Sequence, residues 1–169
     1  DNNEGHALAG VMGGFESGVV ESSTSIVIES AFFDPVLIAR TARLYGISSD
    51  AAYRFERGVD WQLQKQAMER ATRLLLDIVG GKPGIVSESV AEEHLPSMKK
   101  VVLRSWRLNQ VLGIDIEKTE VTNILERLGM TELEVTDDGW SVVAPSYRFD
   151  IVREEDLIEE VARLFGYDN

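Results

Sequence analysis

The sequence contains no cysteine, so it holds no disulfide framework, no thiolate nucleophile and no cysteine zinc site. It also has no apolar run near the roughly 18 residues that a membrane-spanning helix needs. Basic side chains are scarce: 17 lysines and arginines stand against 29 acidic residues, and the formal net charge is −12. That sign excludes a freestanding nucleic-acid binder whose affinity comes from neutralising phosphates. The opening DNNEGH is unlike a secretory signal, and we expect a cytoplasmic protein.

Length and composition indicate a globular chain. Its 169 residues are enough for one domain or two small ones, and a hydrophobic content of 44% is enough for a packed core. Charge is divided unevenly, because residues 101–169 hold 15 of the 29 acidic groups but 7 of the 17 basic groups. The polar segment EEHLPSMKK ends at residue 100 and contains a proline, as linkers do. We therefore predict one domain over 1–92, a linker over 93–100 and a second domain over 101–169.

The first portion of the chain has the pattern of a mixed α/β domain. Short runs rich in valine and isoleucine at 7–12 and 25–31 predict strands, and several glycines lie in the connection between them. Asp34 is placed to cap a helix that has proline at its first position and ends at Gly46. Apolar residues at helical spacing predict a longer helix over about 60–80 with its apolar face turned inward.

The second portion predicts a compact α+β unit. A strand near 101–103 precedes a helix that Ser105 caps and Gly113 ends, and a second helix ends before Gly129. The sequence DDG at 137–139 joins two alternating segments as a hairpin, and an amphipathic helix follows. The fold class is therefore α+β, similar to winged or helix-turn-helix domains in this portion, although such similarity does not carry function. The expected core consists of Leu108, Val111, Leu112, Val121, Ile124, Leu125, Leu128, Val142, Leu157, Ile158 and Val161.

The last predicted helix begins with a cluster of acidic side chains. Asp156, Glu159 and Glu160 lie three and four residues apart, so they are neighbours on one helix face, and Asp150 precedes them. Two explanations fit this repulsive arrangement. Acids near a helix start interact favourably with the macrodipole, and Glu159 can pair with Arg163. Alternatively, the carboxylates bind a hard divalent cation such as Mg²⁺, which takes oxygen ligands.

Four motifs, in this order, carry a resemblance to a known family. They are VMGG at 11–14, IESAFFDP at 28–35, SDAAYRFERGVD at 49–60 and PSYRFDIVREEDLIEEVARLFGYD at 145–168. Together they resemble the beta subunit of bacterial phenylalanyl-tRNA synthetase over essentially the whole chain. The first portion is similar to the C-terminal part of that subunit's tRNA-editing domain, and the second portion to the small fifth domain that follows.

The resemblance implies an activity for the whole enzyme. Members of the family are α₂β₂ class II ligases that join phenylalanine to its tRNA with ATP and Mg²⁺, and the aminoacylation site lies on the alpha subunit. The beta subunit's editing domain hydrolyses tyrosine wrongly attached to that tRNA. We therefore expect the alpha subunit and tRNA(Phe) as partners, ATP to be bound elsewhere in the enzyme, and no aminoacylation by this chain alone.

The resemblance also implies roles for individual residues. The discriminating glutamate of the editing pocket matches Glu29, whose carboxylate can accept a hydrogen bond from a tyrosine hydroxyl. The pocket's threonine and alanine match Ser49 and Ala51, and Gly13 matches a glycine beside the tRNA's 3′ end. We expect Glu29 to lie in a cleft floored by the Gly13–Gly14 loop and by residues 49–51.

The resemblance assigns the acidic cluster to a metal site. Asp150, Asp156, Glu159 and Glu160 match the positions of a Mg²⁺ site shared with the alpha subunit. Because only some ligands come from this chain, we expect it to bind Mg²⁺ weakly by itself and to be stabilised by millimolar Mg²⁺ more than by sodium.

Alternatives stay open at this point. Glu29 could instead form an ion pair with Arg54 or Arg57. The chain could also be a noncatalytic module that docks protein or RNA, or a structural spacer between other domains. An extended basic stripe would favour RNA, and the sequence has none.

Overall fold

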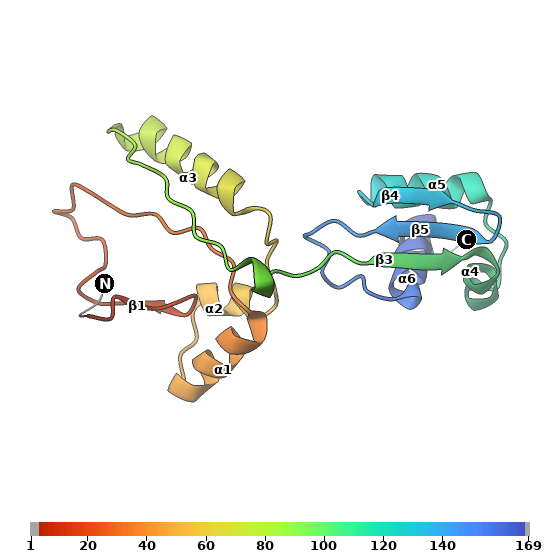
Figure 1. Cartoon of the computed structure of the whole chain (residues 1–169), viewed down its shortest axis with the longest axis horizontal. Coiled ribbons are helices and arrows are strands. Elements are labelled where there is room, and N and C mark those ends of the chain that lie inside the picture. Colours follow the sequence, from red (N-terminus) through yellow and green to blue (C-terminus); the bar gives the residue numbers. More distant parts are fainter. Residues whose placement is uncertain (1–3, 168–169) are drawn as a thin grey trace. The chain divides into compact units, whose positions relative to one another are not determined.

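The computed structural model describes residues 4–167 and divides into two compact units, Asp1–His94 (unit 1) and Leu95–Asn169 (unit 2). Each unit is described by itself. Helices and short antiparallel strands occur in both, which confirms the predicted α+β class. The predicted linker, 93–100, contains the end of a short 3₁₀ helix, η1 (Glu92–His94), and the first residue of strand β3. Figure 1 shows the element order.

Unit 1 begins with a small hairpin. Strand β1 (Ala7–Leu8) pairs antiparallel with β2 (Met12–Gly13), so the single strand predicted over 7–12 is two short strands. The turn between them needs Gly10, whose φ is 68°. A Cβ there would lie 2.6 Å from the side chains of both Phe33 and Ile38. Glycine therefore lets the hairpin pack closely against the following helix.

Helix α1 (Pro35–Tyr45) forms as predicted from its capping residues. The Asp34 side chain accepts a 2.8 Å hydrogen bond from the Leu37 amide, and Gly46 ends the helix with φ 64°. A short helix, α2 (Asp50–Phe55), follows and was not predicted. These elements share the small core of unit 1, made of Val11, Ile38, Ala42 and Ala52.

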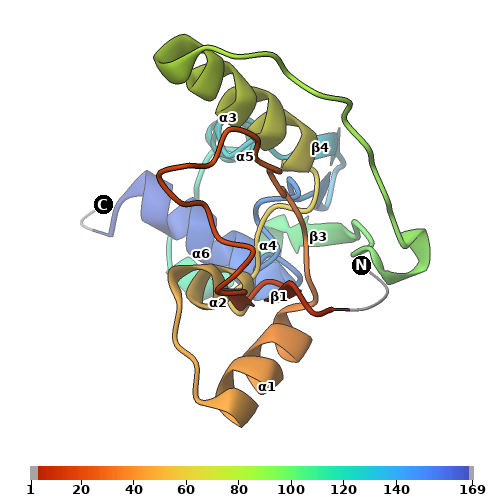
Figure 2. The ribbon, with the colours of Figure 1, turned by 90° about the vertical axis from the view of Figure 1, so that its left-hand side faces the viewer.

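Two predictions for unit 1 are wrong. Residues 25–31 form no strand, because a strand needs a neighbouring strand to receive its backbone hydrogen bonds. Helix α3 (Gln64–Val79) begins about four residues later than expected, and none of its residues is buried. Leu74 and Ile78, expected to face inward, are exposed. In both views α3 stands apart from α1 (Figure 1, Figure 2). The apolar face of α3 is only half-buried, through Ala67, Ala71 and Leu75.

Unit 2 is a three-stranded antiparallel sheet combined with three helices. Its strand order is β3-β5-β4, so the central strand β5 pairs with both edges. Gly139 begins β5 with φ 153°, and a Cβ at this position would overlap the carbonyl of Leu103. In chain order the elements are β3 (Lys100–Arg104), α4 (Ser105–Leu112), α5 (Lys118–Arg127), β4 (Thr131–Val135), β5 (Gly139–Val143) and α6 (Glu154–Phe165).

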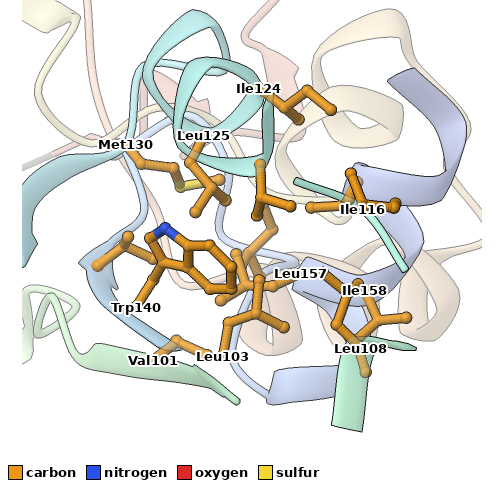
Figure 3. Packing of buried hydrophobic residues seen from close by; sticks show 14 residues of the cluster. Val101, Leu103, Leu108, Ile116, Ile124, Leu125, Met130, Trp140, Leu157 and Ile158 are labelled. Carbon is orange, nitrogen blue, oxygen red and sulfur yellow. The ribbon is translucent and has the colours of Figure 1, made fainter. Parts of the chain in front are cut away.

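The core of unit 2 is centred on Trp140. Its ring is 1% exposed and lies among side chains from the sheet and the helices (Figure 3), while its Nε1 donates to Thr122 Oγ1 at 2.9 Å. Each large apolar side chain buried here contributes about 1.5–3 kcal/mol. Most of the expected core residues are buried, with Leu112 and Leu128 packed at its margin. Val111 is 49% exposed, so its assignment to the core is wrong.

One predicted cap in unit 2 is also wrong. Ser105 is the first residue of α4 rather than its cap; Arg104 occupies the cap position, and its side chain makes no capping hydrogen bond. The amide of Ser105 instead donates to the carbonyl of Asp138 in the hairpin loop. Gly113 ends the helix as expected, with φ 74°. Among residues 4–167, no helix is both long enough and apolar enough to cross a membrane.

Candidate functional site

Glu29 lies at the edge of a hollow in unit 1 of about 270 Å³. Phe55, Val59, Leu63 and Ala67 give the hollow apolar walls, and Glu29 itself is exposed. Its volume is just below the range of roughly 300–1,000 Å³ that is usual for small-molecule sites. An apolar hollow with a carboxylate at its edge can hold an aromatic ring and accept a hydrogen bond from a polar group on that ring.

The backbone beside Glu29 is anchored to the start of α3. The Ser30 hydroxyl donates a 2.9 Å hydrogen bond to the carbonyl of Gln64. The Gln64 side-chain amide donates to the carbonyl of Ala31 at 3.3 Å and to that of Asp60 at 2.9 Å. Because residues 24–34 lie outside helices and strands, these bonds join an irregular segment to a helix.

Gly13 lies in a second hollow, formed by the β1–β2 hairpin. The residues that line this hollow are Gly5, Ala7, Leu8, Met12, Gly13 and Gly14. None of them lines the hollow beside Glu29. A Cβ added at Gly13 would meet no atom within 4 Å, so the space over this residue is open. At Gly14 a Cβ would lie 2.5 Å from the carbonyl oxygen of His6, whose oxygen also accepts a hydrogen bond from the Gly14 amide.

Ser49 is engaged in the local structure of unit 1. Its hydroxyl donates to the carbonyl of Val11 and accepts a 3.1 Å hydrogen bond from the Ala52 amide, which caps α2. Ser49 is therefore placed beside the hairpin that carries Gly13. Ala51 lies in the first turn of α2 and is exposed.

The structure brings Ser49 to the hairpin but places Glu29 in the other hollow. The expectation of one cleft containing Glu29, the Gly13–Gly14 loop and residues 49–51 is thus not met within the described residues. The alternative partners of Glu29 are paired elsewhere, because Arg54 lies 3.9 Å from Asp50, and Arg57 pairs with Glu56 at 2.5 Å.

The acidic helix α6 uses Asp156 to close its own first turn. Oδ2 of Asp156 accepts hydrogen bonds from the amides of Val152 and Arg153, at 2.9 and 2.8 Å. This is the reciprocal half of a capping box, which satisfies backbone donors before the helix begins. Glu154 accepts hydrogen bonds from the Arg104 guanidinium through both carboxylate oxygens, and these bonds hold the pKa of Glu154 below its ordinary value. The same pair joins the start of α6 to the end of β3.

Glu160, on the second turn of α6, is the one buried charged residue among those described, at 7% exposure. Arg148 donates to it at 2.8 Å and Arg163 at 2.6 Å. Hydrogen bonds from these two guanidinium groups hold the pKa of Glu160 at about 2. Arg163 therefore pairs with Glu160 and not with Glu159 as predicted, and Glu159 is exposed.

Asp150 joins the same network through Arg148. Nε and Nη2 of Arg148 donate to the two oxygens of Asp150 at 2.9 and 2.7 Å, a bidentate pair that lowers the pKa of Asp150 and raises that of Arg148. The loop before α6 is thereby folded against the helix. Arg148 and Arg163 thereby neutralise Asp150 and Glu160, two of the four carboxylates that the sequence places close together.

This arrangement does not fit a Mg²⁺ ion. A cation needs carboxylate oxygens that converge on one point, whereas Asp150 and Glu160 face guanidinium groups and Asp156 faces backbone amides. Across residues 4–167, no three histidine, aspartate or glutamate side chains gather so as to hold a metal ion. The Mg²⁺ site implied by the resemblance stays a prediction for the assembled enzyme.

Two residues that shape the hollow beside Glu29 and the acidic cluster at α6 are not among the site residues predicted from the sequence. Gln64 bonds the backbone of the residues that follow Glu29, and Arg148 binds Glu160, but the sequence patterns pointed to neither. An arginine two residues before Asp150 and twelve before Glu160 was a usable signal, because a cluster of like charges requires a counter-charge. Gln64 left no comparable signal in the sequence.

Comparison with known proteins agrees with the two-part organisation. Residues 1–80 match the B3/4 domain family, and residues 101–167 match the tRNA synthetase B5 domain family. The chain is 54% identical over 168 residues to the phenylalanine–tRNA ligase beta subunit of Pseudomonas syringae pv. tomato, covering 99% of this chain and 21% of that protein. It is 54% identical over 169 residues to the same subunit of Pseudoalteromonas translucida, covering 100% and 21%. For Hahella chejuensis the identity is 53% over 168 residues, covering 99% and 21%.

Proposed function

The chain belongs to the phenylalanine–tRNA ligase beta subunits, of which it spans about a fifth of the length, and on this basis we propose that unit 1 forms part of a hydrolytic editing site. In this proposal the whole subunit acts with an alpha subunit that carries out the ATP- and Mg²⁺-dependent charging of tRNA(Phe). Unit 1 contributes to the removal of tyrosine attached to that tRNA by error.

The hollow beside Glu29 is the observation that carries the proposal. Phenylalanine and tyrosine differ by one hydroxyl group, so an apolar hollow alone discriminates poorly between them. A carboxylate at its edge accepts a hydrogen bond that only tyrosine can donate, and a hydrogen bond to a charged group contributes about 1.5–3 kcal/mol. Glu29 is therefore assigned the recognition of the tyrosine hydroxyl, with Phe55 and Leu63 beside the ring.

The test uses the whole synthetase carrying Glu29→Ala. We expect hydrolysis of tyrosyl-tRNA(Phe) to fall about tenfold or more, while phenylalanine charging is unchanged, because only tyrosine presents the hydroxyl. Glu21→Ala is the matched control, since Glu21 is an exposed carboxylate outside the hollow. Hydrolysis of tyrosyl-tRNA at the wild-type rate by the Glu29 variant would sink the proposal.

Unit 2 is proposed to act as a self-contained packing module within the subunit. Its core is continuous through the sheet and helices, and Glu160, the buried carboxylate of α6, is neutralised within the unit by Arg148 and Arg163. These features favour a scaffold that holds other parts of the synthetase. For this unit, the alternative of a structural spacer is therefore retained in the proposal. The same proposal includes a contact between unit 2 and the alpha subunit. If substitutions on the exposed face of α6 stopped the alpha subunit from co-purifying with the beta subunit, that result would support the contact.

A further inference from the structure

Gln64 is the first residue of α3, is half-buried, and connects three separate pieces of backbone. Its side-chain nitrogen donates to Ala31 at 3.3 Å and to Asp60 at 2.9 Å, and its own carbonyl accepts from the Ser30 hydroxyl at 2.9 Å. Two of these three bonds end on the residues that directly follow Glu29. The backbone next to the carboxylate is thus fastened to the helix start.

These bonds matter because the segment around Glu29 has no sheet to hold it. Residues 24–34 belong to no helix and no strand, so neither helical nor ladder hydrogen bonds fix their position. Ser30, Gln64 and Asp60 all line the hollow together with Glu29. Any movement of the segment away from α3 would carry Glu29 away from the apolar walls supplied by Leu63 and Ala67.

We propose that Gln64 is a positioning residue that sets the selectivity of the editing site for tyrosine, by holding Glu29 against the apolar hollow. This inference rests on the proposed function. Gln64 itself touches no reacting atom; it acts through the backbone of Ser30 and Ala31.

Glutamine suits this role because its amide nitrogen has two hydrogens, which can serve two carbonyl acceptors at once. Glutamate at the same position would present oxygens to both carbonyls and repel them. Leucine has similar size but no donor, so it removes the side-chain bonds while keeping the bulk beside the hollow. The bond from Ser30 to the Gln64 carbonyl survives in that variant, and Ser30→Ala removes it separately.

The experiment measures selectivity in the whole synthetase. For each variant, hydrolysis of tyrosyl-tRNA(Phe) and of phenylalanyl-tRNA(Phe) is followed under the same conditions, and the ratio of the two rates is compared. We expect Gln64→Leu to lower this ratio roughly three- to tenfold, corresponding to one or two hydrogen bonds, and Ser30→Ala to lower it less. Gln66→Leu is the matched control, since Gln66 is exposed on the same helix turn and should leave the ratio unchanged.

A double variant separates positioning from a general loss of structure. If Gln64 acts through Glu29, then Gln64→Leu should lower the ratio no further in a Glu29→Ala background. A purely structural effect would instead lower both rates in parallel and leave the ratio unchanged, and that result overturns the inference. Ser30→Ala leaves α3 intact, so it tests the same anchoring if the Gln64 variant folds poorly.

The outcomes distinguish this inference from the proposed function. A Glu29→Ala enzyme with a reduced ratio, beside a Gln64→Leu enzyme with the wild-type ratio, overturns the positioning role and leaves the editing role of Glu29 standing. A Glu29→Ala enzyme with the wild-type ratio overturns both.

Discussion

Arg148 and Glu160 form a 2.8 Å ion pair that ties the loop before α6 to the second turn of that helix. Glu160 is buried, and the Arg148 side chain is 23% exposed, so water screens the pair only in part. The same arginine also binds Asp150. A single guanidinium group therefore fixes both the loop and the helix face.

Removing the charge of Glu160 should destabilise unit 2. Glu160→Gln keeps the shape but leaves Arg148 and Arg163 without their shared carboxylate, and we expect the free energy of unfolding to fall by about 1–3 kcal/mol. Denaturant unfolding measures the change in a full chain that carries Trp61→Phe and Trp106→Phe, so that the fluorescence reports the buried Trp140. Glu159→Gln removes an exposed charge one residue away and should change stability by less than about 0.5 kcal/mol. Equal losses in the two variants would contradict the role of the network.

Stability should also decline in acid because of Glu160. Hydrogen bonds from Arg148, followed by those from Arg163, lower its pKa from the ordinary 4.5 to about 2. A carboxyl whose pKa is lower in the folded state binds fewer protons there, so its stabilisation is complete above the unfolded value and is lost as the pH falls through the folded value. We expect the free energy of unfolding to drop between about pH 5 and pH 2. Glu160→Gln should show a shallower decline, and an identical pH profile for both proteins would contradict the assignment.

The parts of the fold that could be predicted are those that a short stretch of sequence determines by itself. Helix α1 has its cap at Asp34 and its end at Gly46, and helices α5 and α6 repeat their apolar residues at helical spacing. The same spacing predicted most of the core residues of unit 2. Trp140 was missed because it lies beside the hairpin turn, where alternation alone does not show which face is covered.

The parts that could not be predicted depend on contacts between distant residues. The segment 25–31 has the composition of a strand, but strand formation depends on a neighbour that composition does not reveal. For the candidate site, the resemblance supplied Glu29 and the acidic cluster, but it did not supply Gln64 or Arg148. Gln64 lies 35 residues along the chain from Glu29 and bonds the backbone beside it, and Arg148 lies in an irregular loop and binds Glu160. Periodicity carries no information on either contact.

Two adjacent glycines in the hairpin should respond differently to alanine. Gly13 has open space over it, so Gly13→Ala should leave the melting temperature almost unchanged. A Cβ at Gly14 would press on the carbonyl of His6, so Gly14→Ala should lower stability by about 1–3 kcal/mol. Thermal unfolding followed by circular dichroism compares the two variants.

The open space at Gly13 also allows a functional test. If the 3′ end of tRNA approaches the backbone there, as the resemblance implies, the added methyl group of Gly13→Ala should slow tyrosyl-tRNA hydrolysis in the whole synthetase without loss of stability. A fully active Gly13→Ala enzyme would contradict that approach, whereas equal stability losses at both glycines would contradict the hairpin geometry.

Magnesium should stabilise this chain no more than sodium does at the same ionic strength. The resemblance led us to expect a specific Mg²⁺ effect, but the guanidinium group of Arg148 lies against Asp150 and Glu160, and backbone amides bind Asp156. An ion would have to displace a bidentate pair and then lose part of its own strongly held water. Millimolar MgCl₂ should therefore raise the melting temperature only as far as ionic screening does.

The control for this prediction is the double variant Asp156→Asn with Glu160→Gln, which removes two of the four carboxylates at nearly constant shape. Wild type and double variant should respond equally to MgCl₂, because neither offers converging oxygen ligands. A larger rise in wild type that the double variant lacks would mean that the carboxylates do capture the ion, and that Arg148 moves aside to admit it. The same measurement with Arg148→Met tests that competition directly, since an apolar side chain frees Asp150 of its arginine and leaves Glu160 with Arg163 alone. A Mg²⁺ response that appears only in the Arg148 variant would show that the arginine occupies the place of a cation in this chain.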